Sequence, residues 1–147
     1  LDYWIRTKNI TDDLLVIASD NYFEFDVLQF IATYNGNNTL VCIYDVGDKT
    51  KAKQFGVVQL DGLKVIKLEE KPIEPKGTLV ATACYIFPHR IFPLLSKYCA
   101  KGLRDNLGGF IAYLVDRDEV HAYTFTGPWF DVGSIDVYKS IDKELGG

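Results

Sequence analysis

The stretch Leu14-Leu15-Val16-Ile17-Ala18-Ser19-Asp20-Asn21 decides the fold. Its apolar residues run without interruption into a polar Ser-Asp-Asn end, which predicts a short strand buried on both faces. Strands of this kind belong to parallel sheets that are covered by helices. In such sheets ligands bind beyond the carboxyl ends of the strands. Asp20 therefore either stands where a metal or phosphate site is expected, or it only caps a turn.

Composition and charge predict a single globular domain that binds neither nucleic acid nor membrane. The chain has 147 residues, of which 48% are hydrophobic and 24% charged, as in ordinary folded domains. Its formal net charge is −4, and no run of Lys and Arg offers a nucleic-acid surface. No stretch approaches the roughly 18 apolar residues of a membrane span, and no secretory signal pattern is present.

The cysteines and the lack of methionine bear on the compartment and on completeness. Cys42, Cys84 and Cys99 are far apart and odd in number, which predicts reduced thiols in a cytoplasmic protein. No C-x-x-C pair or Cys/His cluster favours a zinc site. The chain contains no Met. We therefore expect residues 1–147 to form a single partial domain of a longer product.

Patterns along the chain predict an α/β fold. Strand, helix and strand over 14–18, 24–35 and 39–45 form a βαβ unit, and Asp61-Gly62 between two β-rich runs signals a tight hairpin. Ser134 has the character of the N-cap of a last helix. Further helices are expected over 88–99 and 107–115, and further strands over 79–87 and 119–125. Together they predict one mixed sheet with helices on its faces.

Two acidic residues occupy the same kind of position. Asp20 follows the first strand, and Asp131 ends a later strand just before a glycine. Magnesium prefers oxygen ligands and usually takes one or two protein carboxylates together with substrate phosphates. If both residues meet at one sheet edge, they form a magnesium site. The alternative is that both only form turns.

Other stretches could contact a ligand, although each also has a purely structural explanation. In Leu68-Glu69-Glu70-Lys71-Pro72, Lys71 could hold a phosphate and Glu70 could accept hydrogen bonds from sugar hydroxyls. A solvated strand end is the usual fate of such charge runs. Gly56 marks either a close approach of the backbone to a ligand or a bulge. Tyr85 and Trp129 are more often core residues than ligand platforms.

Taken together, these stretches resemble the sugar-1-phosphate nucleotidyltransferases. This family includes glucose-1-phosphate thymidylyltransferase, the uridylyltransferases and mannose-1-phosphate guanylyltransferase. The resemblance covers about residues 12–145, and the matching stretches follow the family's order and spacing. They are Val16-Ile17-Ala18-Ser19-Asp20-Asn21, Phe55-Gly56-Val57-Val58, Glu69-Glu70-Lys71-Pro72, Ala83-Cys84-Tyr85-Ile86-Phe87 and Gly127-Pro128-Trp129-Phe130-Asp131-Val132-Gly133-Ser134.

The resemblance implies a Rossmann-like catalytic fold and a reaction. A nucleoside triphosphate and a sugar 1-phosphate would give a nucleotide-sugar and pyrophosphate, with Mg²⁺ as cofactor. It also implies residue roles: Asp20 and Asp131 as magnesium ligands, Lys71 on the sugar phosphate, Glu70 on sugar hydroxyls, the Gly56 backbone on the sugar, and Tyr85 and Trp129 lining the sugar pocket. Asp20, Lys71 and Asp131 would be the catalytic residues. Where the family often has Tyr-Gly, this chain has Phe55-Gly56.

One departure from the family concerns the nucleotide half. The family begins with a glycine-rich Gly-Gly-x-Gly-x-Arg-Leu loop that cradles the triphosphate, and this chain has no such stretch. We therefore expect that the N-terminal portion of the domain is missing and that this polypeptide alone is inactive. We also expect the exposed sheet edge to pair with another copy or with the missing part.

Two other functions remain open from the sequence. The chain could be a non-catalytic, sugar-phosphate-binding regulatory subunit, although such a subunit would not need both Asp20 and Asp131. It could also be a glycosyltransferase, which likewise uses acidic residues at strand ends together with a divalent metal ion.

Overall fold

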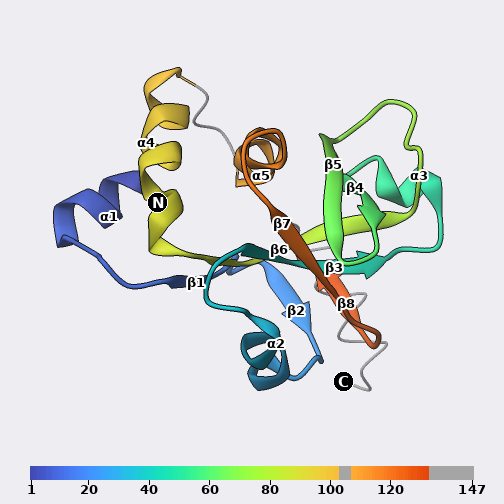
Figure 1. The fold of residues 1–147 in the computed structure, drawn as a ribbon. Helices are drawn as coiled ribbons and strands as arrows, with labels where there is room; N and C mark the ends of the chain where they lie inside the picture. The colour runs from blue at the N-terminus through green and yellow to red at the C-terminus, as the bar shows by residue number, and fades with distance from the viewer. Residues whose placement is uncertain (103–106, 133–147) are drawn as a thin grey trace.

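A six-stranded mixed sheet forms the centre of the computed structural model, which describes residues 1–102 and 107–132 (Figure 1). The strands lie in the order β1-β6-β3-β7-β5-β4. Among the pairings of the described residues, β3 with β7 is parallel and the others are antiparallel. The predicted α/β fold with a mixed sheet is confirmed. The strands are β1 (Leu14–Ile17), β3 (Thr39–Asp45), β4 (Gly56–Asp61), β5 (Lys64–Glu70), β6 (Leu79–Phe87) and β7 (Val120–Thr124).

Helices cover both faces of this sheet, α4 and α5 on one side and α2 on the other (Figure 1). Successive residues of β3 alternate between the two layers. Val41 packs with the residues of α4 and α5, whereas Cys42 packs with Phe30 of α2. No helix of the described residues is long and apolar enough to cross a membrane. The helices are α1 (Asp2–Lys8), α2 (Val27–Thr33), α3 (Lys49–Ala52), the 3₁₀ turn η1 (His89–Ile91), α4 (Phe92–Ala100) and α5 (Leu107–Val115).

The prediction that the first strand is buried on both faces was wrong. β1 is the end strand of the sheet and pairs only with β6 among the described residues, in antiparallel direction. Its burial alternates, with Leu15 40% and Ile17 42% exposed. The central strands β3 and β6 are buried on both faces instead. β1 and β3 run parallel to each other, but β6 lies between them.

The predicted hairpin is confirmed, with Gly62 in its turn at φ 58°. Glycine adopts this left-handed conformation without the steric cost of a Cβ atom. The hairpin curls back so that β4 also pairs with β6, where Gly56 stands opposite Ala81. The last predicted helix, from Ser134, lies outside the described residues.

A second, two-stranded sheet was not predicted. β2 (Asn21–Phe23) pairs antiparallel with β8 (Trp129–Asp131). The strands lie near α2, on the side of the main sheet away from α4 and α5 (Figure 1). Asp26 caps the N-terminus of α2, since its carboxylate accepts hydrogen bonds from the backbone N–H groups of Leu28 and Gln29. This cap fixes where the chain turns from β2 into α2.

A carboxylate clamp joins β1 to η1 and to the end of α2. Asp13 accepts hydrogen bonds from the backbone N–H of His89 at 2.8 Å, from its Nδ1 at 2.9 Å, and from the hydroxyl of Tyr34 at 2.8 Å. The backbone hydrogen bond from His89 is the main reason why the pKa of Asp13 is lowered. The clamp holds the beginning of the edge strand in place.

Replacing this carboxylate should destabilise the fold. We expect Asp13→Ala to lower the free energy of unfolding by about 1–2 kcal/mol near neutral pH, since hydrogen bonds to a charged group are lost. The folded pKa of Asp13 lies below its unfolded value of about 3.9. The difference from wild type is therefore complete above that pH and shrinks as the pH falls through the folded pKa. Urea unfolding at several pH values measures it. Asp12, the exposed neighbour, provides the control. An equal loss of unfolding free energy in Asp12→Ala would contradict the clamp.

Candidate functional site

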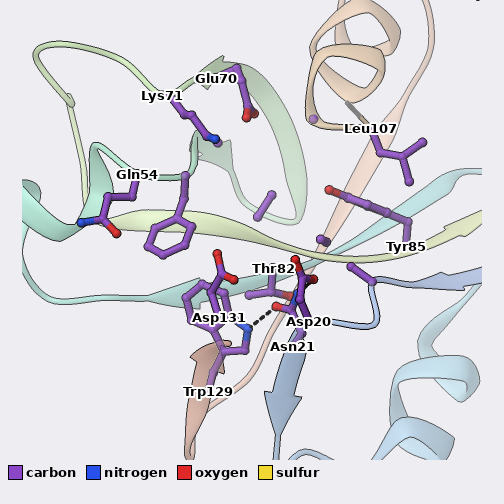
Figure 2. Close-up of a pocket in the computed structure, with 16 residues that line it drawn as sticks. Asp20, Asn21, Gln54, Glu70, Lys71, Thr82, Tyr85, Leu107, Trp129 and Asp131 are labelled. Atoms are coloured by element: carbon purple, nitrogen blue, oxygen red, sulfur yellow. Dashed lines mark hydrogen bonds between the residues drawn. The ribbon is translucent and has the colours of Figure 1, made fainter. Parts of the chain in front are cut away.

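A cavity of about 320 Å³ opens between the curled hairpin, β6 and the two-stranded sheet (Figure 2). This volume is within the range of small-molecule sites. The residues that the sequence singled out come from separate stretches, and all of them line this one cavity. They are Asp20, Gly56, Glu70, Lys71, Tyr85, Trp129 and Asp131. Their individual roles remain predictions.

The two acidic residues are brought together by the small sheet, and not by strand ends at one edge of the main sheet. β2 and β8 pair with Asn21 opposite Asp131. The backbone N–H of Val132 donates to the carbonyl oxygen of Asp20 at 2.6 Å. Both aspartates line the cavity, and in Figure 2 the Asp131 carboxylate points into it.

This pair fits a magnesium ion that also binds substrate phosphates. Within residues 1–102 and 107–132, no group of three or more His, Cys, Asp or Glu side chains could hold a metal. Two carboxylates are nevertheless sufficient, because Mg²⁺ commonly keeps several waters and takes its remaining ligands from phosphates. Asp20 and Asp131 are the residues that would hold it.

The hairpin places a glycine directly under a carboxylate. Gly56 stands opposite Glu70 in the β4–β5 register. A Cβ atom on Gly56 would lie 3.0 Å from Glu70 Oε2 and 3.3 Å from Leu68 Cδ2. Burial raises the pKa of Glu70, and the charge of Lys71 opposes this effect. The absence of a side chain at position 56 thus gives the Glu70 carboxylate its position above the cavity.

Lys71 follows β5 in an unusual backbone conformation. Its φ is 45°, a left-handed conformation that carries strain in a residue with a Cβ atom. Its backbone N–H donates to the carbonyl oxygen of Phe55 at 3.0 Å, which holds this turn. The side chain points toward the middle of the cavity (Figure 2). The turn therefore places the Lys71 ammonium group in the same cavity as the two aspartates.

Tyr85 contributes a buried hydroxyl from β6. The residue is 3% exposed, and its hydroxyl points into the cavity (Figure 2). Burial, and secondarily the charge of Glu70, raise the pKa of this hydroxyl, so it stays protonated at neutral pH. Two residues earlier, Ala83 has a φ of 55°. Its carbonyl oxygen accepts a hydrogen bond from the N–H of Ala18 at 3.0 Å, which fixes the segment that leads to Asp20.

Trp129 forms part of the cavity wall with its indole N–H already in use. The residue is 9% exposed, and its Nε1 donates to Asn21 Oδ1 at 2.8 Å. Its ring contacts Phe55 edge-on at 5.0 Å between centroids, and Tyr44 at 5.4 Å. A ligand could therefore contact Trp129 only through its ring.

The cavity also contains residues that were not singled out from the sequence. Asn21 directly follows Asp20, so its place in the motif was a signal. Thr82 lies in β6, directly before the quoted motif that begins at Ala83. Leu107 and Gly108, at the start of α5, had no local signal, because only the packing of α5 brings them to the cavity. The remaining members are Ala18, Gln54, Phe55, Ala81 and Ala83.

Solved structures with the same fold include sugar-nucleotide enzymes. A structure described as the glucose-1-phosphate thymidylyltransferase of Bacillus anthracis with sucrose superposes at a TM-score of 0.73, with 24% identity. A UTP-bound UGPase from Acinetobacter baumannii gives 0.76 and 24%. A UDP-glucose pyrophosphorylase complexed with UDP-glucose gives 0.81 and 20%.

These superpositions cover 95%, 97% and 96% of this chain, in the same order. They cover only 57%, 53% and 59% of the respective solved chains. The present chain thus spans little more than half the length of these structures, and it shares their fold. The sequence itself matches the nucleotidyl transferase family over residues 3–146, which is almost its whole length. The chain therefore belongs to the nucleotidyl transferase family.

Proposed function

We propose that this chain supplies the sugar-phosphate half of a sugar-1-phosphate nucleotidyltransferase. The reaction would join a nucleoside triphosphate and a sugar 1-phosphate into a nucleotide-sugar, with release of pyrophosphate. One observation carries the proposal: acidic, basic and aromatic residues from separate stretches of the chain converge on one cavity. Family membership supports the reaction class. The relatives named above include proteins described with UTP and with UDP-glucose.

The residues have the chemistry that this reaction needs. The sugar phosphate oxygen attacks the α-phosphorus in line, the new P–O bond forms, and the bond to pyrophosphate breaks. Lys71 would bind the sugar phosphate, while Glu70 accepts hydrogen bonds from sugar hydroxyls. Tyr85, which stays protonated, can donate to a ligand oxygen. Asp20 and Asp131 would hold Mg²⁺, which when bound neutralises phosphate charge. Positioning then accounts for much of the rate, and no covalent nucleophile is needed.

A sugar 1-phosphate should bind to this cavity, and a cation should be essential for it. We expect glucose 1-phosphate with Mg²⁺ to bind the 147-residue chain in a calorimetric titration. Lys71→Gln should weaken binding at least tenfold, because the phosphate loses its positive partner. The exposed Lys53, directly after α3, provides the control, and Lys53→Gln should bind as wild type does. Equal affinities for all three proteins would contradict the assignment.

The glycine under Glu70 offers a test of the sugar-binding role. In Gly56→Ala the new Cβ would lie 3.0 Å from Glu70 Oε2, so the carboxylate must move. We expect at least a tenfold loss of affinity for glucose 1-phosphate. The control is Gly77→Ala, since a Cβ there meets no atom within 4 Å. Circular dichroism checks that both variants are folded. If Gly56→Ala then binds glucose 1-phosphate as tightly as Gly77→Ala does, Glu70 does not bind the sugar hydroxyls from this position.

The isolated chain should bind but not turn over. Its sequence has no glycine-rich triphosphate loop, so we propose that it releases no pyrophosphate from a nucleoside triphosphate and a sugar 1-phosphate. The alternative, a non-catalytic sugar-phosphate-binding subunit, shares this expectation but does not require two metal ligands. Pyrophosphate release by the pure chain would contradict the inactivity.

We propose that the outer edge of β1 pairs with another polypeptide, such as a second copy of this chain. The edge exposes Leu15 and Ile17, at 40% and 42%, and an uncovered apolar edge favours strand pairing. In the pure chain we expect dimers by light scattering at high concentration. Leu15→Lys should shift them to monomers, whereas Leu63→Lys on the hairpin should not. A strictly monomeric wild-type chain would contradict self-association.

A further inference from the structure

Two consecutive hydrogen bonds connect Trp129 to Asp20. The indole Nε1–H donates to Asn21 Oδ1 at 2.8 Å (Figure 2). Asn21 Nδ2 in turn donates to Asp20 Oδ1 at 3.0 Å. An indole N–H can only donate, so the atom of Asn21 that faces it must be the amide oxygen. The amide nitrogen is then turned toward Asp20. Trp129 thus decides which way Asn21 points, and Asn21 holds one carboxylate oxygen of Asp20.

Both ends of this relay are fixed by their surroundings. At one end, Trp129 is 91% buried and lies against the rings of Phe55 and Tyr44. At the other end, the backbone of Asp20 accepts the N–H of Val132. The strand pairing of β2 with β8 runs between these ends. The relay is therefore built into a part of the fold that has little freedom to rearrange.

We propose that Asn21 and Trp129 are positioning residues for the metal site of Asp20 and Asp131. Asn21 holds Asp20 Oδ1, which leaves Oδ2 for a divalent cation. Trp129 acts through Asn21 and does not itself contact the cation. This inference rests on the proposed function, because it assumes that the aspartates hold a metal ion. It adds a role for the indole N–H that a residue merely lining a pocket would not have.

The relay predicts that metal affinity depends on two residues that do not themselves contact the metal ion. Mn²⁺ serves as the probe, because free Mn²⁺ is counted directly by electron paramagnetic resonance. Trp129→Phe keeps an aromatic ring and removes the donor, and Asn21→Leu keeps much of the shape and removes both hydrogen bonds. We expect each change to weaken Mn²⁺ binding about tenfold or more, as is usual when the residues that orient a ligand are replaced. Trp4→Phe, at a residue 57% exposed on α1, is the matched control and should bind as wild type does.

A double variant separates a relay from general damage. If Trp129 acts through Asn21, Trp129→Phe should cause little further loss once Asn21→Leu is present. Losses that multiply would overturn the relay. Thermal melts accompany each titration.

A second measurement uses the protein without any substitution in the relay. In NMR spectra, Mg²⁺ should shift the indole ¹⁵N signal of Trp129 and leave that of Trp4 unchanged. Trp4→Phe assigns the two signals. An unshifted Trp129 signal at saturating Mg²⁺ would also overturn the relay.

The outcomes distinguish this inference from the function on which it rests. If Asp20→Asn weakens Mn²⁺ binding but Asn21→Leu and Trp129→Phe do not, the relay is wrong and the two-carboxylate site stands. If Asp20→Asn binds Mn²⁺ as tightly as wild type, the proposed metal site fails and the relay fails with it. If all three weaken binding and the double variant is not additive, both are supported.

Discussion

The pairing of β2 with β8 is the constraint on which the site depends. It sets Asn21 opposite Asp131 and Phe23 opposite Trp129, so it joins two parts of the chain that are far apart in sequence. Without it, Asp20 would follow an edge strand with no acidic partner nearby. A short ladder has few backbone hydrogen bonds and is weak in isolation. Here it is reinforced by aromatic packing around Trp129 and by the side-chain bond to Asn21.

The opposite wall of the cavity depends on strained backbone that is held by ordinary hydrogen bonds. Lys71 and Ala83 both have positive φ values, which cost free energy in residues with a Cβ atom. In each case a bond to a distant segment maintains the conformation: Lys71 to Phe55, and Ala83 to Ala18. Phe55 is shared by both walls, because its carbonyl holds Lys71 and its ring contacts Trp129. The cation and the carboxylates are thus positioned by one connected set of contacts.

Local patterns predicted the parts of this structure that local forces determine. The hairpin at Asp61-Gly62 and the strands β3 and β6 follow from turn chemistry and apolar runs. The candidate residues that line the cavity could be singled out because they lie in contiguous motifs. The burial of β1 could not be predicted, since an apolar run does not show whether a strand is central or at an edge. The two-stranded sheet and the role of Asn21 depend on a partner more than a hundred residues away, which no local pattern contains.

The segments that form the cavity are synthesised at different times, which has a consequence for folding. β2 and β8, which bring Asp20 and Asp131 together, are more than a hundred residues apart in the sequence, so the contacts between them have a large sequence separation. Such contacts carry the greatest loop-closure cost and tend to form late. The central strands can assemble before β8 is available, but the cavity cannot. Any ligand of this cavity would therefore stabilise only molecules in which β8 has docked against β2.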